Sequence, residues 1–217
     1  MIDLEQTIRE RHSTRLFLPN KPVPRDLVEE ALALAVCAPS NSNIQPWHVV
    51  FASGPPRDRL VKALCEEAQR RPPNIPPLPE SFKHFRSDLG AQVYGAMGIT
   101  REDKAGHTAA VLRNWEFFCA PLAGIVCMHK DLGPADALSV GMFLQTLLLA
   151  LTARGLGSCV EVSITGYPEV IRAELDIPAE LSILCGVAVG YPDPDFAANK
   201  LHVGREPIGK NVVFLDT

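Results

Sequence analysis

The longest apolar stretch of the chain, residues 137–153, constrains the fold more than any other segment. It is short for a membrane span, which needs about 20 predominantly apolar residues, and it is interrupted by polar side chains. These are Ser139, Gln145, Thr146 and Thr152. We therefore expect a helix over residues 135–154 that is buried in protein and ends at Gly155, where glycine suits a helix C-cap. With 217 residues, 47% of them hydrophobic, the chain can bury the core of one domain.

Shorter apolar patterns predict that helices and strands alternate along the chain. Continuous apolar or β-branched runs predict strands over residues 48–52, 122–128, 159–162 and 183–189. Apolar residues at helical spacing predict helices over residues 3–10, 27–36, 58–69, 81–97, 101–117 and 167–175. Strands separated by helices indicate a layered α/β or α+β fold, and we expect residues 1–217 to form a single domain.

Two segments contain so many prolines that they cannot form regular secondary structure over their whole length. Residues 71–79 contain five prolines, which argues against a helix or a central strand. We expect this segment to be a surface excursion near a site. Residues 191–217 are kept extended by Pro192, Pro194 and Pro207. Because this C-terminal arm has few ways to bury its own apolar residues, we expect it to lie on another surface, such as that of a partner subunit.

The charge and the cysteine content exclude several classes of partner. The formal net charge is -4 and the pI is about 5.9, whereas nucleic acids and membrane surfaces require a basic face. The N-terminal residues lack the charged and apolar pattern of a signal sequence. Six cysteines without a C-x-x-C motif and six histidines without metal-ligand spacing indicate neither a disulfide framework nor a metal site. We expect a reduced, cytoplasmic protein that binds no metal.

Residues 11–15 place two guanidiniums and a hydroxyl close together in the sequence. Alternate side chains of an extended segment point the same way, so Arg11, Ser13 and Arg15 can share one concave face. Arginine binds phosphate through a planar fork and stays charged at any relevant pH. The segment therefore predicts an anion site, which Arg205 of the C-terminal arm would complete if it lay beside Arg11. The alternative is a solvated surface turn.

Residues 39–47 indicate a rigid loop that is rich in hydrogen-bonding side chains. The polar residues between Pro39 and Pro46 are Ser40, Asn41, Ser42, Asn43 and Gln45. Amides both donate and accept, which suits the uracil-like edge of an isoalloxazine. The alternative is a helix stop followed by a hydrogen-bonded turn. Residues 164–166 form a second permissive segment, which could lie against the face of a flat ring.

The order of these motifs resembles that of the FMN-dependent nitroreductase family, and the C-terminal part is most similar to its nitrobenzoate-type branch. The motifs span nearly the whole chain. They are Arg-His-Ser-Thr-Arg at 11–15, Ala-Pro-Ser-Asn-Ser-Asn-Ile-Gln-Pro-Trp at 38–47, Asn114 before Phe-Phe-Cys-Ala-Pro at 117–121, Gly-Leu-Gly-Ser at 155–158, Gly-Tyr-Pro at 190–192 and Arg-Glu-Pro at 205–207. The chain departs from some relatives at Val203, where they have a lysine, and at Thr165, where they have an acidic residue.

The resemblance implies an α+β fold, with a central sheet flanked by helices, in an intertwined homodimer whose C-terminal extension crosses to the partner. Two FMN sites would then lie at the subunit boundary. By position, Arg11, Ser13 and Arg205 would hold the FMN phosphate, and Arg15 would lie near flavin N1 and O2. The other implied cofactor-binding positions are His12, Asn114, Gln145, Ile164, Thr165 and Gly166, with Pro39, Ser40, Asn41, Asn43 and Gln45 supplied by the loop of the partner chain.

The implied activity is NAD(P)H-driven, ping-pong reduction of nitroaromatic or similar electron-poor acceptors in a single pocket. No catalytic side chain is implied, because the flavin carries the chemistry while the protein sets position and electrostatics. Alternatives on the same fold are reductive dehalogenation, reduction of quinones or enones, and oxygen-dependent cleavage of the flavin. A flavin-binding protein without turnover is a further alternative, and so is an α+β domain without a cofactor.

Overall fold

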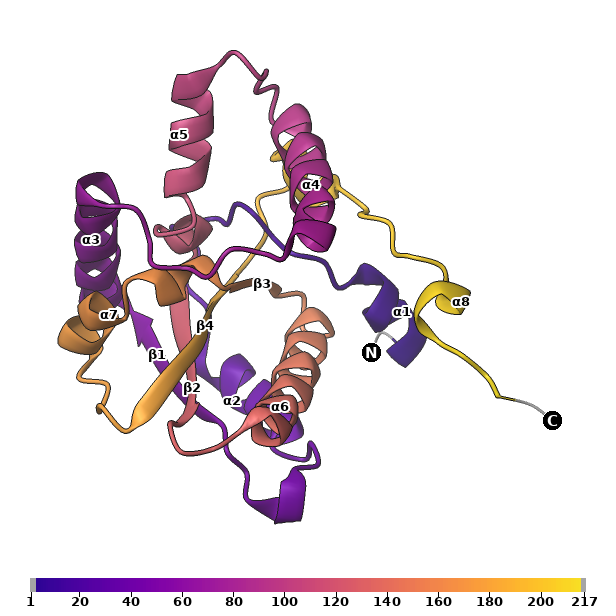
Figure 1. The fold of residues 1–217 in the computed structure, drawn as a ribbon. Coiled ribbons are helices and arrows are strands. Elements are labelled where there is room, and N and C mark those ends of the chain that lie inside the picture. The colour runs from indigo at the N-terminus through magenta and orange to yellow at the C-terminus, as the bar shows by residue number, and fades with distance from the viewer. Residues whose placement is uncertain (1–2, 216–217) are drawn as a thin grey trace.

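A four-stranded antiparallel sheet forms the centre of the computed structural model, which describes residues 3–215 (Figure 1). The strands are β1 (His48–Ser53), β2 (Leu122–His129), β3 (Gly157–Glu161) and β4 (Leu181–Gly190), in the order β1-β2-β4-β3. The four predicted strands are confirmed to within two residues at each end. Every strand pair is antiparallel, so the fold is α+β rather than α/β. The most apolar strands, β2 and β4, lie in the centre, where both faces of the sheet are covered.

Helices α2 (Arg25–Ala35) and α6 (Pro134–Thr152) cover one face of the sheet. The inner side of α6 buries Phe143, Leu147 and Leu151, and burial of each such side chain stabilises the fold by about 1.5–3 kcal/mol. By length and composition alone α6 could cross a membrane, but it packs on the sheet as the predicted buried helix. Its outer side is exposed at Leu138. Gly155 follows with a φ of 73°, in the left-handed conformation expected at a helix end.

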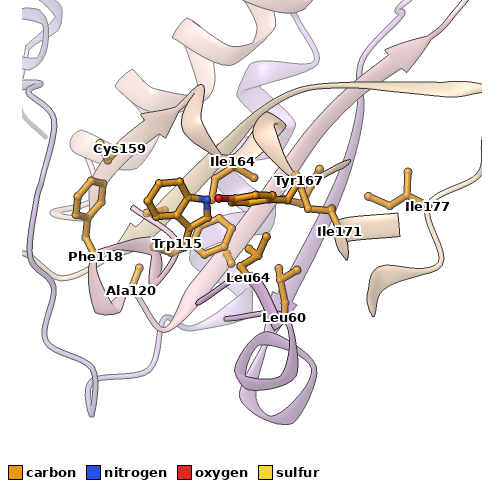
Figure 2. Close-up of a cluster of buried hydrophobic side chains, with 14 of the residues drawn as sticks. Leu60, Leu64, Trp115, Phe118, Ala120, Cys159, Ile164, Tyr167, Ile171 and Ile177 are labelled. Carbon is orange, nitrogen blue, oxygen red and sulfur yellow. The ribbon is translucent and has the colours of Figure 1, made fainter. Parts of the chain in front are cut away.

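Helices α3 (Gly54–Arg70) and α7 (Pro168–Leu175) lie over the opposite face. Leu60 and Leu64 of α3 and Ile171 of α7 meet there in a buried cluster with Trp115 and Tyr167 (Figure 2). Helix α3 begins at Gly54 rather than at the predicted residue 58. Its first turn contains two prolines, which are tolerated there because the first N–H groups of a helix need no partner within it.

The segment between α3 and β2 extends beyond the sheet (Figure 1). Residues 72–79 form no helix or strand, and they lead to η2 (Glu80–Phe82), α4 (Lys83–Ala96) and α5 (Lys104–Leu112). The helix predicted over residues 101–117 is therefore wrong at its end. The chain instead turns at η3 (Phe117–Cys119), whose three residues have φ values of 49°, 52° and 64°. Bulky residues disfavour such positive φ angles, so the propensities of this segment do not predict the turn.

Helix α1 (Leu4–Glu10) and helix α8 (Ile208–Asn211) lie on the same side of the structure (Figure 1). Helix α1 precedes an extended segment that joins the edge of β3. The described part of the C-terminal arm is largely extended but contains the short helices η5 (Ala197–Lys200) and α8. Beyond α8 the arm leaves the body of the chain, and Phe214 is 77% exposed.

Candidate functional site

An extended segment that follows α1 runs beside the outer edge of β3. Thr14 N–H donates to Ser158 O at 3.0 Å, in a parallel pairing with that strand. Arg15 N–H donates to Asn199 Oδ1 at 2.7 Å, and Asn199 Nδ2 donates to Leu16 O at 2.8 Å. Because Asn199 is buried, these bonds hold the segment firmly between β3 and the C-terminal arm.

A cavity of about 660 Å³ lies over this segment and is named the arginine cavity. Four arginines line it, Arg9 from α1, Arg11 and Arg15 from the segment that follows, and Arg205 from the arm. The other residues of its wall are Ile8, His12, Ser13, Leu89, Gln145, Leu201, His202, Val203. The fold thus brings together cations from the two ends of the chain.

Arg9 pairs with Glu5 at 2.6 Å, but Arg11, Arg15 and Arg205 have no counter-ion within residues 3–215. None of these three forms an ion pair with Asp or Glu. Arg15 Nη1 donates to Ser13 O at 3.1 Å, and Arg205 Nη1 donates to Val203 O at 2.7 Å. Burial lowers the pKa of Arg11, and the positive charge of Arg205 lowers it further. Because a guanidinium stays protonated even so, the arrangement is suited to an anion.

A second cavity of about 660 Å³ adjoins the first and is named the Glu161 cavity. Ser13, Arg15 and Leu89 line both cavities. The remaining wall comes from the proline-rich segment, α4, α5, the turn before β2 and the end of β3. Its residues are Pro73, Ile75, Arg86, Gly90, Val93, Tyr94, Met97, Ala110, Val111, Arg113, Asn114, Trp115, Phe118, Cys159, Val160, Glu161, Val162, Ser163. A single elongated ligand could therefore occupy both cavities and pass Arg15 between them.

Polar groups without partners gather in the wall of the Glu161 cavity. Both carboxyl oxygens of Glu161, Trp115 Nε1 and Arg113 Nη1 are buried and form no hydrogen bond in the described part of the chain. Burial raises the pKa of Glu161 well above its usual range. Since buried polar groups in proteins are nearly always hydrogen-bonded, these atoms mark a place where a polar ligand would be bound.

Asn114 lies in the same wall and joins two of its segments. Asn114 Nδ2 donates to Val111 O at 2.8 Å, and its Oδ1 accepts from Ser163 Oγ at 3.3 Å. The second bond ties the turn before β2 to η4 (Ser163–Gly166). The left-handed turn at Phe117–Cys119 follows directly. Backbone strain of this kind concentrates at functional sites, which is consistent with a binding role for this wall.

Comparison with known proteins places this arrangement in a family. The sequence profile of the nitroreductase family matches residues 8–191. The chain belongs to the nitroreductase family. It is similar to the 4-nitrobenzoate reductase of Pseudomonas putida, with 33% identity over 210 residues that cover 94% of this chain and 92% of that protein.

Solved structures of the nitroreductase family share the fold of this chain. One is the FMN-dependent nitroreductase NfnB from Mycobacterium smegmatis in complex with NADPH, with a TM-score of 0.90, 31% identity and coverage of 98% of this chain and 97% of that one. Another is the FMN and NADPH-dependent nitroreductase NfnB from Sphigopyxis sp. strain HMH, with a TM-score of 0.94, 27% identity and full coverage of both chains. The predicted family and its nitroreductase-like fold are confirmed.

About half of the site positions implied by the nitroreductase resemblance lie at the two cavities. Those in the wall of the arginine cavity are Arg11, His12, Ser13, Arg15, Gln145 and Arg205, and Asn114 lines the Glu161 cavity. His12 Nδ1 lies 2.7 Å from Glu10 O and donates to it, since a carbonyl oxygen only accepts. Its buried Nε2 forms no hydrogen bond within residues 3–215.

The amide-rich loop lies elsewhere in its own chain. Pro39, Ser40, Asn41, Asn43 and Gln45 line neither cavity. The turn η1 (Asn41–Asn43) is held at the start of α6, where Asn41 N–H donates to Ser139 Oγ at 3.1 Å. Ser42, Asn43 and Gln45 have positive φ angles, which are strained for residues other than glycine. The loop is thus fixed in shape, with its amides exposed and away from the cavities of the same chain.

The predicted ring-facing segment, Ile164, Thr165 and Gly166, also lies outside both cavities. Ile164 is fully buried in the core. Gly166 O accepts from Asn74 N–H at 3.0 Å, and a side chain at Gly166 would collide with Pro73. The proline-rich segment therefore covers this glycine and also forms part of the wall of the Glu161 cavity.

Sequence reasoning did not identify Glu161, Trp115 or Arg113 as site residues. A signal for Glu161 was present, because an acidic residue inside the apolar run from Cys159 to Val162 is unusual for a buried strand. Trp115 and Arg113 carried no comparable signal. Their role in the wall depends on the turn that places Asn114 beside Ser163.

Proposed function

We propose that this protein is an FMN-dependent oxidoreductase that uses NAD(P)H to reduce nitroaromatic or similar electron-poor acceptors. The observation that carries the proposal is the arginine cavity, in which Arg11, Arg15 and Arg205 meet without a carboxylate. The relatives support it, since the NfnB proteins are FMN-dependent nitroreductases and a further relative is a 4-nitrobenzoate reductase.

The two adjoining cavities fit the two ends of FMN. A phosphate dianion matches Arg11 and Arg205, and Ser13 supplies a hydroxyl beside them. The Glu161 cavity, with apolar side chains and a few polar groups in its wall, suits a flat heteroaromatic ring. Bound FMN would supply the electron transfer between NAD(P)H and the acceptor.

The side chains of this chain would position the flavin and set its electrostatic surroundings. Arg15 lines both cavities, so it can place a fixed positive charge at the pyrimidine edge and stabilise negative charge that develops there. Asn114 can turn its amide from Val111 and Ser163 towards the same edge. No side chain acts as a nucleophile in this scheme, and water can supply the protons.

A third cavity supports a role for an anionic co-substrate such as NADPH. It has a volume of about 790 Å³ and is named the basic cavity, because Lys83, Arg86, Arg101 and His107 line it. Its wall contains no acidic residue. Arg86, Gly90 and Tyr94 line both this cavity and the Glu161 cavity. A dinucleotide could therefore place its phosphates among these cations and its nicotinamide near the flavin.

Exposed apolar surface supports a homodimer. Leu4 and Ile8 on α1 are 69% and 52% exposed, and Leu138 on α6 is 67% exposed. Large apolar side chains left exposed in this way are typical of subunit interfaces. We infer a two-fold dimer in which residues 191–217 embrace the partner and residues 39–45 complete the partner's flavin site. In the same proposal residues 1–217 form one FMN-binding domain, with residues 71–79 as an excursion beside the site, in a soluble, cytoplasmic enzyme.

The proposed activity is tested first by the visible spectrum of freshly purified protein and by identification of the flavin released from it. We expect yellow protein with stoichiometric FMN, and oxidation of NAD(P)H that accelerates when a nitroaromatic acceptor is added. Colourless protein that does not take up added FMN would overturn the proposal. FMN-loaded protein that oxidises no NAD(P)H with nitroaromatic, quinone or halophenol acceptors would instead identify a flavin-binding protein.

The dimer is tested separately by light scattering on the full chain and on a chain that ends at Glu206. The removed residues include Ile208 and Phe214, which are 73% and 77% exposed in the single chain. We expect the full chain to be dimeric. The shortened chain should form a weaker dimer, which dissociates at a higher protein concentration than the dimer of the full chain. A monomeric full chain with bound FMN would contradict the intersubunit site.

A further inference from the structure

The end of β3 carries a buried acid that the proposed activity does not use. Glu161 is 3% exposed, and both of its carboxyl oxygens lack a hydrogen bond within the described residues. Side chains alternate along a strand. Cys159 and Glu161 therefore face the protein, whereas Val160 and Val162 are 37% and 60% exposed. The position of the acid is thus fixed by strand pairing and does not result from a mobile side chain.

The surroundings of Glu161 favour the neutral form of its carboxyl. The Cys159 thiol on β3 and the Cys185 thiol on β4 interact electrostatically with it, and burial raises the pKa of each to about 12. Arg15, Arg86, Arg113 and Tyr94 line the same cavity, but no ion pair joins an arginine to Glu161 in residues 3–215. Burial therefore dominates and raises the pKa of Glu161 well above its usual range.

A neutral carboxyl has one O–H donor and one carbonyl acceptor. The same wall holds two further donors without partners, Trp115 Nε1 and Arg113 Nη1. Leaving a buried donor unsatisfied is costly, and two such donors lie in one wall together with both oxygens of Glu161. A ligand whose edge offers several acceptors would satisfy them together.

The connection between the cavities indicates which part of a ligand reaches this wall. On the proposed function, the phosphate of FMN lies among the arginines and the chain that follows it passes Ser13 and Arg15. The ring system is then the part that enters the Glu161 cavity. The carbonyl oxygens and the N1 and N5 nitrogens of the oxidised ring are hydrogen-bond acceptors, so they complement the unsatisfied donors.

We propose that Glu161 anchors the flavin ring as a neutral hydrogen-bond donor and is thereby a specificity-determining residue of the FMN site. The inference rests on the proposed function. It predicts that flavin binding weakens at alkaline pH, where ionisation removes the O–H donor and places a negative charge against the acceptors of the ring.

The experiment measures the dissociation constant of FMN, by quenching of flavin fluorescence, from pH 6 to pH 9. Wild type is compared with Glu161→Gln, which keeps a neutral donor, and Glu161→Leu, which has none. We expect the dissociation constant of wild type to rise about tenfold over this range relative to that of Glu161→Gln, since one hydrogen bond and an added repulsion are at stake. Glu161→Leu should bind FMN about fivefold more weakly than Glu161→Gln at pH 6.

An infrared measurement keeps the test independent of variant stability. The FMN-free and FMN-bound wild-type proteins should both show the C=O band of a protonated carboxyl, and this band should shift on binding and be absent from Glu161→Gln. Parallel pH profiles for wild type and Glu161→Gln, together with a band that does not shift, would overturn the inference. If the protein binds FMN but shows neither the pH difference nor the band shift, the proposed function stands and only the role of Glu161 is refuted. Protein that binds no FMN would refute both.

Discussion

The arginine cavity and the Glu161 cavity adjoin one another but differ in their electrostatics. In the first, Arg11 and Arg205 carry charge that no carboxylate neutralises within residues 3–215. In the second, burial raises the pKa of Glu161 well above its usual range and so favours the neutral carboxyl. One cavity therefore lacks a negative charge, while the other lacks hydrogen-bond partners for neutral groups.

Because of this difference, the two ends of the site offer different interactions before any ligand binds. Interactions between like charges are long-ranged, so the repulsion between Arg11 and Arg205 favours any anion of suitable size. Hydrogen bonds from Glu161 and Trp115 are short-ranged and directional, so they discriminate between ring edges. Affinity is expected to come mainly from the arginine cavity and selectivity from the Glu161 cavity.

The largest expected effect is the loss of cofactor affinity on removal of a cation from the arginine cavity. Arg11→Ala should raise the dissociation constant of FMN about 100-fold, because a hydrogen bond to a charged group contributes about 1.5–3 kcal/mol. Equilibrium dialysis measures this change. Arg25→Ala is the matched control, since Arg25 is an exposed arginine that pairs with Glu29 at 2.7 Å on α2. Flavin that stays bound to Arg11→Ala as firmly as to the control would contradict the assignment.

The second effect is on stability and separates the Glu161 cavity from its neighbour. A carboxyl whose folded-state pKa is raised stabilises the fold fully below its unfolded pKa of about 4.3, and this contribution is lost as pH rises towards the folded value. The free energy of unfolding of FMN-free wild type should therefore fall from pH 5 upwards relative to that of Glu161→Gln, by at most about 1.4 kcal/mol per pH unit. Urea titrations at several pH values measure the difference, and curves that stay parallel would refute it.

The contrast between the cavities also shows how far sequence reasoning reaches. Arg11, Ser13 and Arg15 were predictable as a cluster, because alternation in an extended segment depends on local geometry alone. The strands were predictable from their apolar runs, and α6 from its length and composition. Glu161 required knowledge of which face of β3 is buried, and a one-residue change of register would have exposed it.

Other parts of the site could not be read from the sequence for different reasons. The left-handed turn at Phe117–Cys119 opposes the local preference of bulky residues and is imposed by tertiary packing. The loop at 39–45 has its own fixed shape but lines neither cavity of its chain, so its proposed role needs a second subunit. The covering of Gly166 by Pro73 depends on the path of the proline-rich segment, for which prolines exclude structures but specify none.

A third prediction concerns Arg15, which belongs to both cavities. With FMN at saturation, Arg15→Ala should slow the bleaching of flavin absorbance by NAD(P)H about tenfold in stopped-flow experiments. The expected loss is smaller than the 100-fold or greater loss seen for buried donors at charge-developing sites, because Arg15 is only half-buried. Arg15→Lys keeps the charge without the planar fork and should give an intermediate rate. An unchanged bleaching rate in both variants would show that Arg15 does not stabilise negative charge on the flavin. Arg15 would then contribute only to binding in the arginine cavity.

The smallest expected effect tests whether charge selectivity extends beyond these two cavities. Arg86 lines both the Glu161 cavity and the basic cavity, and its side chain is exposed. Exposed charge pairs contribute about 0.2–1 kcal/mol, so Arg86→Gln should raise KM for NADPH no more than about fivefold. The change should shrink at high salt, since ions screen exposed charges.

NADH provides the internal comparison for Arg86, because it lacks the additional phosphate of NADPH. If the basic cavity holds that phosphate, KM for NADH should stay within about twofold of wild type in Arg86→Gln, since the variant removes no contact that NADH makes. Equal changes in KM for NADPH and NADH would indicate that Arg86 contacts a part of the molecule that both co-substrates share. Selectivity for NADPH would then have to arise from Lys83, Arg101 or His107, which line the basic cavity away from the flavin.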